Sequence, residues 1–277
     1  MPGRVPHACG RASALATHGA ARLVPSLLLV LLAGAACSQP AGEPTAHGSP
    51  TPLDPASYGT VRGTVSFAGT APPPVAAALA SDPTCAALHP DGLTTRPVVV
   101  TADGRLADAF VWIARGLESH VFPVPEEPVV IEQEGCLFVP RVAGVRAGQA
   151  LVFRSSDDTL HNVRGAPTRA PGWNVGMARP GAERRMVLTA PEVMIPIHCD
   201  VHPWMTAFVG VLAHPYFAVT GTDGRFTLAD LPAGRYELAA WHPVLGRRTR
   251  ALTVAAGETI DADLRFPSEL DSVDPAP

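Results

Sequence analysis

The amino-acid sequence predicts an all-β protein. Its 277 residues include 30 prolines and 25 glycines, many of which separate short apolar runs. This composition favours short strands joined by turns over long helices. Apolar residues also recur with a period of two, the pattern of a strand with one buried face. The clearest alternating runs are Val193, Ile195, Ile197 and Cys199, and then Ile260, Ala262, Leu264 and Phe266.

Residues 1–36 have the pattern of a secretory signal peptide. Three arginines precede the apolar run 23–32, and four small residues follow it. The run is too short to span a membrane. Cys37 comes directly after the small residues, which resembles the signal of bacterial lipoproteins. We therefore expect an exported protein held to a membrane through a lipid on Cys37, with plain signal cleavage as the alternative.

Residues 37–57 are rich in Pro, Ser and Gly and are expected to form a flexible tether. The folded body follows, and residues 269–277 are expected to be a tail. Loss of the signal peptide removes three arginines and no acids, so 18 Arg face 25 Asp and Glu, a formal charge of −7. A surface of this sign argues against nucleic acid as a partner.

Three cysteines remain once Cys9 leaves with the signal peptide and Cys37 is set aside for the lipid. An odd number in an oxidising compartment leaves one cysteine for another role. If Cys199 is a metal thiolate, Cys85 and Cys136 are free to pair. The sequence permits this disulfide without requiring it.

A thiolate, an imidazole and a thioether recur at intervals of three at Cys199, His202 and Met205. Soft sulfur ligands with imidazole suit copper, and one Cys with two His and a weak axial Met is the blue-copper arrangement. The second imidazole must come from elsewhere in the chain. His161, which lies 38 residues before Cys199, is the candidate.

These motifs resemble those of the cupredoxins, specifically the plastocyanin and amicyanin type. The matching residues are His161-Asn162 and the loop Cys199-x2-His202-x2-Met205. The resemblance is strongest over 125–213 and implies a Greek-key β-sandwich with one type 1 copper site, within an elaborated domain over 58–213. It implies that Asn162 ties the two ligand loops together.

The resemblance also implies an exposed imidazole edge at His202, through which electrons would leave. Pro203 and Trp204 would form an apolar docking patch around this edge. The expected function is therefore to carry single electrons between redox partner proteins in the periplasm or at the cell surface, without enzymatic activity.

The segment TDGRFTLADLPAGRYELAAWHP, with its two turn motifs, resembles the carboxypeptidase-regulatory, transthyretin-like β-sandwich, a small non-catalytic module. We therefore expect a second, smaller sandwich over 214–268. The segment 58–124 is expected to pack on the cupredoxin body as an extra sheet. A short helix over 76–88 is expected to be interrupted by Pro83.

Other functions remain open. Copper capture or delivery without electron transfer is the main alternative, and a structural sandwich that holds no metal is another. His198 beside the candidate thiolate allows a nitrite-reductase-like enzyme, although Asp200 and the C-terminal module offer no second copper domain. Cys199 and His202 as a nucleophile–base pair is a remote possibility. His214 and His242 are expected to be structural histidines.

Overall fold

The computed structural model describes Thr51 and residues 54–268, and almost all of its regular structure is strand. The all-β prediction is confirmed. The described part holds one α-helix, α1 (Pro83–Leu88), and two 3-10 turns, η1 (Pro55–Ser57) and η2 (Leu79–Ser81). None of these helices is long and apolar enough to cross a membrane. The predicted signal peptide, Cys37, most of the tether and the tail lie outside the described residues.

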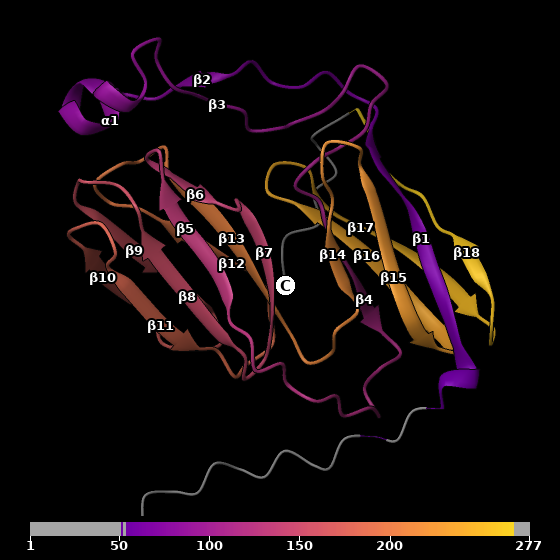
Figure 1. Cartoon of the computed structure of the whole chain (residues 1–277). Helices are drawn as coiled ribbons and strands as arrows, with labels where there is room; N and C mark the ends of the chain where they lie inside the picture. Colours follow the sequence, from indigo (N-terminus) through magenta and orange to yellow (C-terminus); the bar gives the residue numbers. More distant parts are fainter. Residues whose placement is uncertain (1–50, 52–53, 269–277) are drawn as a thin grey trace, which may run out of the picture. The chain divides into compact units, whose positions relative to one another are not determined.

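Two sheets form a sandwich, called here the first sandwich (Figure 1). One sheet has the order β10-β9-β12-β13-β7 and the other the order β11-β8-β5-β6. An apolar core that includes Ile131, Leu151 and Phe153 fills it. The strands are β5 (Val129–Glu134), β6 (Leu137–Val139), β7 (Val142–Arg146), β8 (Ala150–Ser155), β9 (His161–Gly165), β10 (Trp173–Met177), β11 (Glu183–Val187), β12 (Glu192–His198) and β13 (Thr206–Leu212).

Strand β12 carries the apolar alternation that the sequence predicts. Ile195, Ile197 and Cys199 are buried in the core of the first sandwich. Val193 departs from this face, because the register of β12 against β13 shifts between Glu192 and Ile195. Val193 instead packs against a separate apolar cluster built around Phe110. The extended strand therefore directs Cys199 inward at its end.

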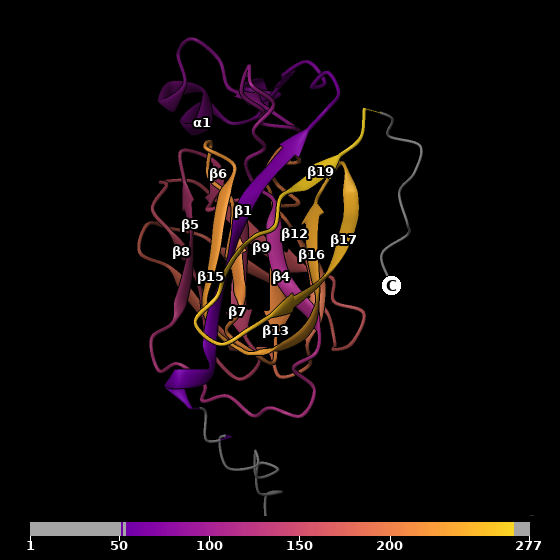
Figure 2. The same ribbon diagram turned by 90° about the vertical axis from the view of Figure 1, so that its right-hand side faces the viewer.

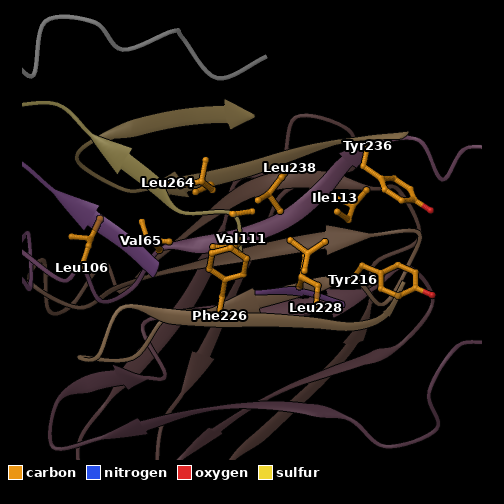
Figure 3. Packing of buried hydrophobic residues seen from close by; sticks show 14 of the residues in the cluster. Val65, Leu106, Val111, Ile113, Tyr216, Phe226, Leu228, Tyr236, Leu238 and Leu264 are labelled. Carbon is orange, nitrogen blue, oxygen red and sulfur yellow. The ribbon is translucent and has the colours of Figure 1, made fainter. Parts of the chain in front are cut away.

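Eight other strands form a second sandwich, whose core is shown in Figure 3. One sheet has the order β14-β4-β16-β17, and in the other β1 pairs with β15, β18 and β19. Figure 2 shows β1 and β19 side by side. The strands are β1 (Tyr58–Phe67), β4 (Phe110–Arg115), β14 (Phe217–Val219), β15 (Arg225–Pro232), β16 (Gly234–His242), β17 (Gly246–Val254), β18 (Thr259–Asp261) and β19 (Leu264–Phe266).

The second sandwich differs from its expected composition. Strands β1 and β4 lie in the segment expected to form an extra sheet on the cupredoxin body, yet they pair with C-terminal strands. Val61, Val65 and Val111 are fully buried in the core of the second sandwich. An apolar strand face is satisfied by any sheet that covers it, and its local pattern does not say which sheet that is. The boundary at 213/214 therefore does not separate the two cores.

The chain between β1 and β4 also forms a lobe that reaches the first sandwich. It contains η2, α1 and a two-stranded ribbon of β2 (Val75–Ala76) and β3 (Thr94–Thr95) (Figure 1). The helix expected over 76–88 is interrupted just before Pro83, as predicted: η2 ends at Ser81 and α1 begins at Pro83, with Asp82 as its cap. Proline suits this position, where its missing N–H would have no partner within the helix. The Asp82 carboxylate accepts hydrogen bonds from the N–H groups of Thr84 and Cys85.

Candidate metal centre

Three of the four predicted ligands meet at one end of the first sandwich. His161 is the first residue of β9, Cys199 follows the last residue of β12, and His202 lies in the turn before β13. Cys199 is 2% exposed and the two histidines are fully buried. One donor atom from each lies within 4.8 Å of the other two. The antiparallel pairing of β12 with β9 and β13 brings these chain segments together.

The donor atoms form a triangle. His161 Nδ1 lies 2.9 Å from His202 Nδ1, and Cys199 Sγ lies 4.0 Å and 3.8 Å from these two atoms. Bond lengths of about 2.0 Å to nitrogen and about 2.3 Å to sulfur would place nitrogen and sulfur roughly 3.8 Å apart around a trigonal metal. The sulfur–nitrogen distances match this value, whereas the two nitrogens, 2.9 Å apart, would separate to roughly 3.5 Å around such a metal. Two imidazoles and a thiolate are the donors that copper prefers, so the site fits a copper ion.

Met205 is held beside these residues by the turn. Its backbone N–H donates to the carbonyl of His202 at 2.9 Å, and its carbonyl accepts from the N–H of Cys199 at 3.2 Å. The Met205 side chain is fully buried in the same apolar core as Cys199. The structure thus gathers all four predicted residues at one end of the sandwich.

Asn162 links the two ligand-bearing segments. Its Oδ1 accepts from the backbone N–H of Asp200 at 2.6 Å, and its Nδ2 donates to the Asp200 carboxylate at 3.1 Å. Asp200 also receives a hydrogen bond from Arg164 Nε at 2.6 Å. This is the link between His161-Asn162 and the Cys199 loop that the sequence comparison implies.

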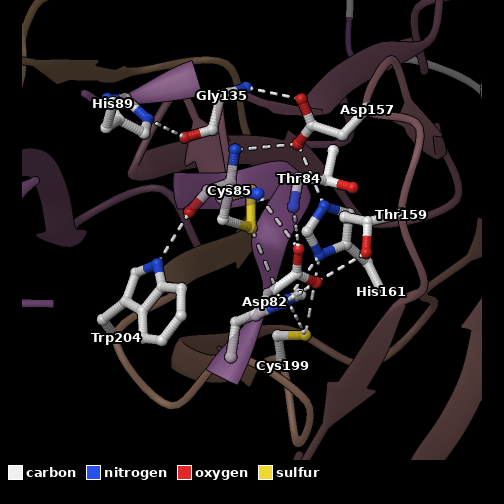
Figure 4. The surroundings of a disulfide bond; sticks show 12 residues. Asp82, Thr84, Cys85, His89, Gly135, Asp157, Thr159, His161, Cys199 and Trp204 are labelled. Atoms are coloured by element: carbon white, nitrogen blue, oxygen red, sulfur yellow. Dashed lines mark hydrogen bonds and ion pairs between the residues drawn. A yellow bond between two sulfur atoms is a disulfide. The ribbon is translucent and has the colours of Figure 1, made fainter. Parts of the chain in front are cut away.

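Two carboxylates complete the site, and the sequence analysis missed both. Asp157 Oδ2 lies 2.9 Å from His161 Nε2, and Asp82 Oδ2 lies 2.9 Å from His202 Nε2. Figure 4 shows both carboxylates beside the cysteine pair. An imidazole that donates through Nε2 presents the lone pair of Nδ1 to a metal. The sequence offered one sign of each carboxylate: the spacing Asp157-x3-His161, and the helix-capping position of Asp82.

The disulfide that the sequence left open is formed between Cys85 and Cys136. Both cysteines are fully buried, and Cys85 Sγ lies 3.6 Å from His202 Nε2. Cys199 is the free cysteine of the described residues. The bond ties α1, in the lobe, to the hairpin between β5 and β6. That hairpin turns through Gly135 and Cys136, both with positive φ, as its two-residue loop requires.

The surroundings shift the pKa values of His161 and Cys199 in opposite directions in the metal-free protein. Burial lowers the pKa of His161, but the hydrogen bond to Asp157 and the nearby Cys199 together raise it to about 9. Burial raises the pKa of Cys199, and the hydrogen bond with His161 and backbone N–H groups bring it below its ordinary value. Burial lowers the pKa of His202 against the opposing effect of Asp82. His161 can therefore donate Nδ1–H to His202 Nδ1.

The expected exposure of His202 is wrong. Its side chain is 1% exposed, because Asp82 and Cys85 cover its Nε2 edge. Trp204 packs on the ring with centroids 5.0 Å apart, and its Nε1–H donates to the carbonyl of Cys136 at 3.0 Å. The sequence resemblance could not reveal this cover, since Asp82 and Cys85 come from the lobe, more than 100 residues before His202 in the chain. The expected docking patch therefore lacks an imidazole edge at its centre.

The remaining histidines lie outside this donor triangle. His198 is half-buried, and the coordination groups found among the described residues do not include it. His242 is fully buried in the second sandwich, where its Nδ1 accepts from the N–H of Val244. His214 Nδ1 accepts from the N–H of Tyr216 in the same way.

No protein-family model matches the chain, and no curated protein is similar to it. A copper-containing nitrite reductase from Thermus scotoductus SA-01 is similar over 37% of this chain and 25% of its own, with 19% identity and a TM-score of 0.29. The chain thus spans a quarter of that protein. A purple cupredoxin from Nitrosopumilus maritimus is similar over 30% of this chain and 98% of its own, with 17% identity and a TM-score of 0.26.

A reduced Cu(I) form of an amicyanin variant is similar over 36% of this chain and 97% of its own, with 17% identity and a TM-score of 0.29. These three structures, a copper-containing nitrite reductase, a purple cupredoxin and an amicyanin variant, are each similar to about a third of the chain. These scores are too low to carry a functional conclusion, which has to come from the side chains of the site.

Proposed function

We propose that the protein binds one copper ion through His161, Cys199, His202 and Met205 and carries single electrons in the cell envelope. The observation that supports it is the buried triangle of two Nδ1 atoms and one Sγ. Copper, when bound, supplies a one-electron couple between Cu(II) and Cu(I). The chain would hold both imidazoles in one arrangement through the change, since the Nε2 of each is hydrogen-bonded to a largely buried carboxylate.

We place this activity in an exported protein of the periplasm or cell surface, anchored through Cys37, with redox proteins of the envelope as partners. The proposal gives the centre no catalytic step. The second sandwich would be a non-catalytic, transthyretin-like module that extends the protein.

A copper titration of the purified protein tests the function. We expect one equivalent of Cu(II) to produce an intense thiolate-to-copper band in the visible spectrum and a reversible one-electron wave. Cys199→Ala should abolish the band. His198→Ala is the matched control, because His198 is adjacent on β12 and half-buried but lies outside the donor triangle. A wild-type protein without the band, or a band that survives in Cys199→Ala, would exclude a type 1 copper site.

Copper capture is the second candidate, and the burial of His202 favours it. An electron carrier exchanges electrons fastest through an exposed ligand edge, whereas a covered site retains its metal. The two functions differ in measurable rates. Fast electron self-exchange with slow loss of copper would support the carrier. Tight Cu(I) binding without a stable Cu(II) form would support capture.

A further inference from the structure

Both imidazoles of the centre make the same two kinds of contact through their ring nitrogens. Nδ1 faces the other histidine and Cys199, and Nε2 faces a carboxylate, Asp157 for His161 and Asp82 for His202. Asp157 is 5% exposed at its side chain and Asp82 is 13% exposed. Both carboxylates are thus largely removed from solvent beside the ring that each contacts.

The disulfide links the two residues whose backbone N–H groups bind the carboxylates. Asp82 Oδ1 accepts from the N–H of Cys85 at 3.0 Å, and Asp157 Oδ2 accepts from the N–H of Cys136 at 2.8 Å. These two cysteines are bonded to each other. The arrangement is therefore a continuous frame, in which a covalent bridge connects two carboxylate–imidazole pairs (Figure 4). Asp82 and Cys85 belong to the lobe and not to the sheets of the first sandwich.

All the groups around Asp82 are donors. Its Oδ1 accepts from the N–H groups of Thr84 and Cys85, and its Oδ2 accepts from Thr159 Oγ1 at 2.6 Å and from His202 Nε2. Burial raises the pKa of Asp82, but these hydrogen bonds lower it to about 2. Four donors around the group fit a carboxylate, which has no proton of its own to place among them. An amide in this place would turn its NH2 toward donors on one side or the other.

We propose that Asp82, delivered by the disulfide-tethered lobe, is a positioning residue that fixes the His202 ring for copper, and that Asp82 and Asp157 together stabilise the more positive oxidation state. This inference rests on the proposed function for its effect on copper, but not for its effect on the ring. A hydrogen bond to a carboxylate makes an imidazole a stronger donor to a metal. Buried negative charge next to the centre favours Cu(II) over Cu(I).

The metal-free protein gives the first test, by nitrogen-15 NMR of the histidine rings in wild type, Asp82→Asn and Asp261→Asn. Asp261 is the matched control, an exposed carboxylate of the second sandwich paired with Arg62. We expect His202 to carry its proton on Nε2 in wild type. This proton should exchange with water at least tenfold faster in Asp82→Asn than in Asp261→Asn. A wild-type His202 that lacks an Nε2 proton, or equal exchange rates in the two variants, would overturn the proposal.

The copper-loaded protein gives the second test. Asp82→Asn should weaken copper binding by about 10- to 100-fold and shift the reduction potential positive, whereas Asp261→Asn should do neither. Thr159→Val should shift the potential the other way, because Asp82 Oδ2 then keeps one donor fewer and more negative charge faces His202. If Asp82→Asn and Thr159→Val shift the potential in the same direction, Asp82 is a structural residue and the proposal is wrong.

The two tests separate the two proposals. A wild-type protein that forms no thiolate-to-copper band refutes the proposed function, while the ring-proton exchange still decides the role of Asp82. A protein that forms the band but shows no difference between Asp82→Asn and Asp261→Asn keeps its function and refutes the positioning role.

Discussion

The two sandwiches bury apolar cores of similar kind but differ in the polar groups placed among them. In the first sandwich the buried polar residues are Gln133, Arg146, Gln149, Ser155, Asp157, His161, Asn162 and His202, whereas in the second they are Thr220 and His242. Buried polar groups cost free energy unless they are paired. The first sandwich pairs both histidines of the candidate site with carboxylates. The buried polar residues Asp157, His161, Asn162 and His202 thus surround the candidate site, whereas Arg146 and Gln149 bond to backbone carbonyls of Phe122, Pro123, Glu127 and Ala213.

Removal of the disulfide should have the largest effect on the stability of the two sandwiches, and it should destabilise the first more than the second. The bridge closes a loop with a sequence separation of 51 residues, which corresponds to about 4 kcal/mol of unfolding free energy in the chain-entropy treatment. We expect Cys85→Ala with Cys136→Ala to lower the stability by up to this amount. Amide hydrogen exchange should show lost protection in β5, β6 and α1.

Strands of the second sandwich should keep their protection in this double variant, because the described residues of that sandwich contain no disulfide. An equal loss in β16 and β17 would show that the two sandwiches unfold as one unit, and the contrast in stability would then be lost.

Acid should act on the second sandwich through His242. Burial, with a smaller effect of Arg141, lowers the pKa of this histidine to about 3. The unfolded chain takes up a proton below about pH 6.5 and the folded protein does not, so stability is present above this pH and falls as the pH falls toward 3. The loss should be about 2–3 kcal/mol between pH 6.5 and 4.5.

Urea denaturation over this pH range measures the effect. His242→Asn keeps an acceptor for the N–H of Val244 and removes the titrating ring, so its stability should depend less on pH. Burial also lowers the pKa of His214 to about 4, so part of the slope should remain. If the unfolding free energy of His242→Asn depends on pH as steeply as that of wild type, His242 is not the group that causes the loss of stability in acid.

A matched pair of aromatic substitutions should have a smaller effect. Trp204→Phe removes the N–H that donates to the carbonyl of Cys136, and Tyr236→Phe removes the hydroxyl that donates to the carbonyl of Pro232. Each should cost about 1 kcal/mol of unfolding free energy. Only Trp204→Phe should alter the copper spectrum, because Trp204 packs on His202. A change in the copper spectrum of Tyr236→Phe would show that the effect of Trp204→Phe is not specific to its contact with His202.

The smallest effects are expected at two exposed ion pairs. Arg62 pairs with Asp261 on the second sandwich, and Arg164 pairs with Asp200 beside the ligand loop. Exposed pairs add little to stability, so Arg62→Ala and Arg164→Ala should both unfold like wild type. The reduction potential should change in Arg164→Ala alone, since Asp200 also binds Asn162. An unchanged reduction potential in both variants would show that the exposed Arg164–Asp200 pair does not affect the centre.

The sequence by itself determined the fold class, the inward face of β12 and the identity of the candidate ligands. Alternation with a period of two is a local property and survives in any sheet. The three-residue spacing of Cys199, His202 and Met205 fits one turn between two antiparallel strands, so it needed no knowledge of distant segments. His161 followed from the resemblance to cupredoxins, through its neighbour Asn162 and its distance from Cys199.

Only the tertiary structure decided which sheet each of β1 and β4 joins, and which residues cover His202. Asp82 and His202 are 120 residues apart in the sequence, and Cys85 and Cys136 are 51 apart. Hydrogen-bond partners at such separations depend on how whole segments pack, because a carboxylate or a strand face accepts any partner of suitable chemistry. The donor atoms of the centre were therefore readable from the sequence, whereas the carboxylates that orient them and the lobe that covers them were not.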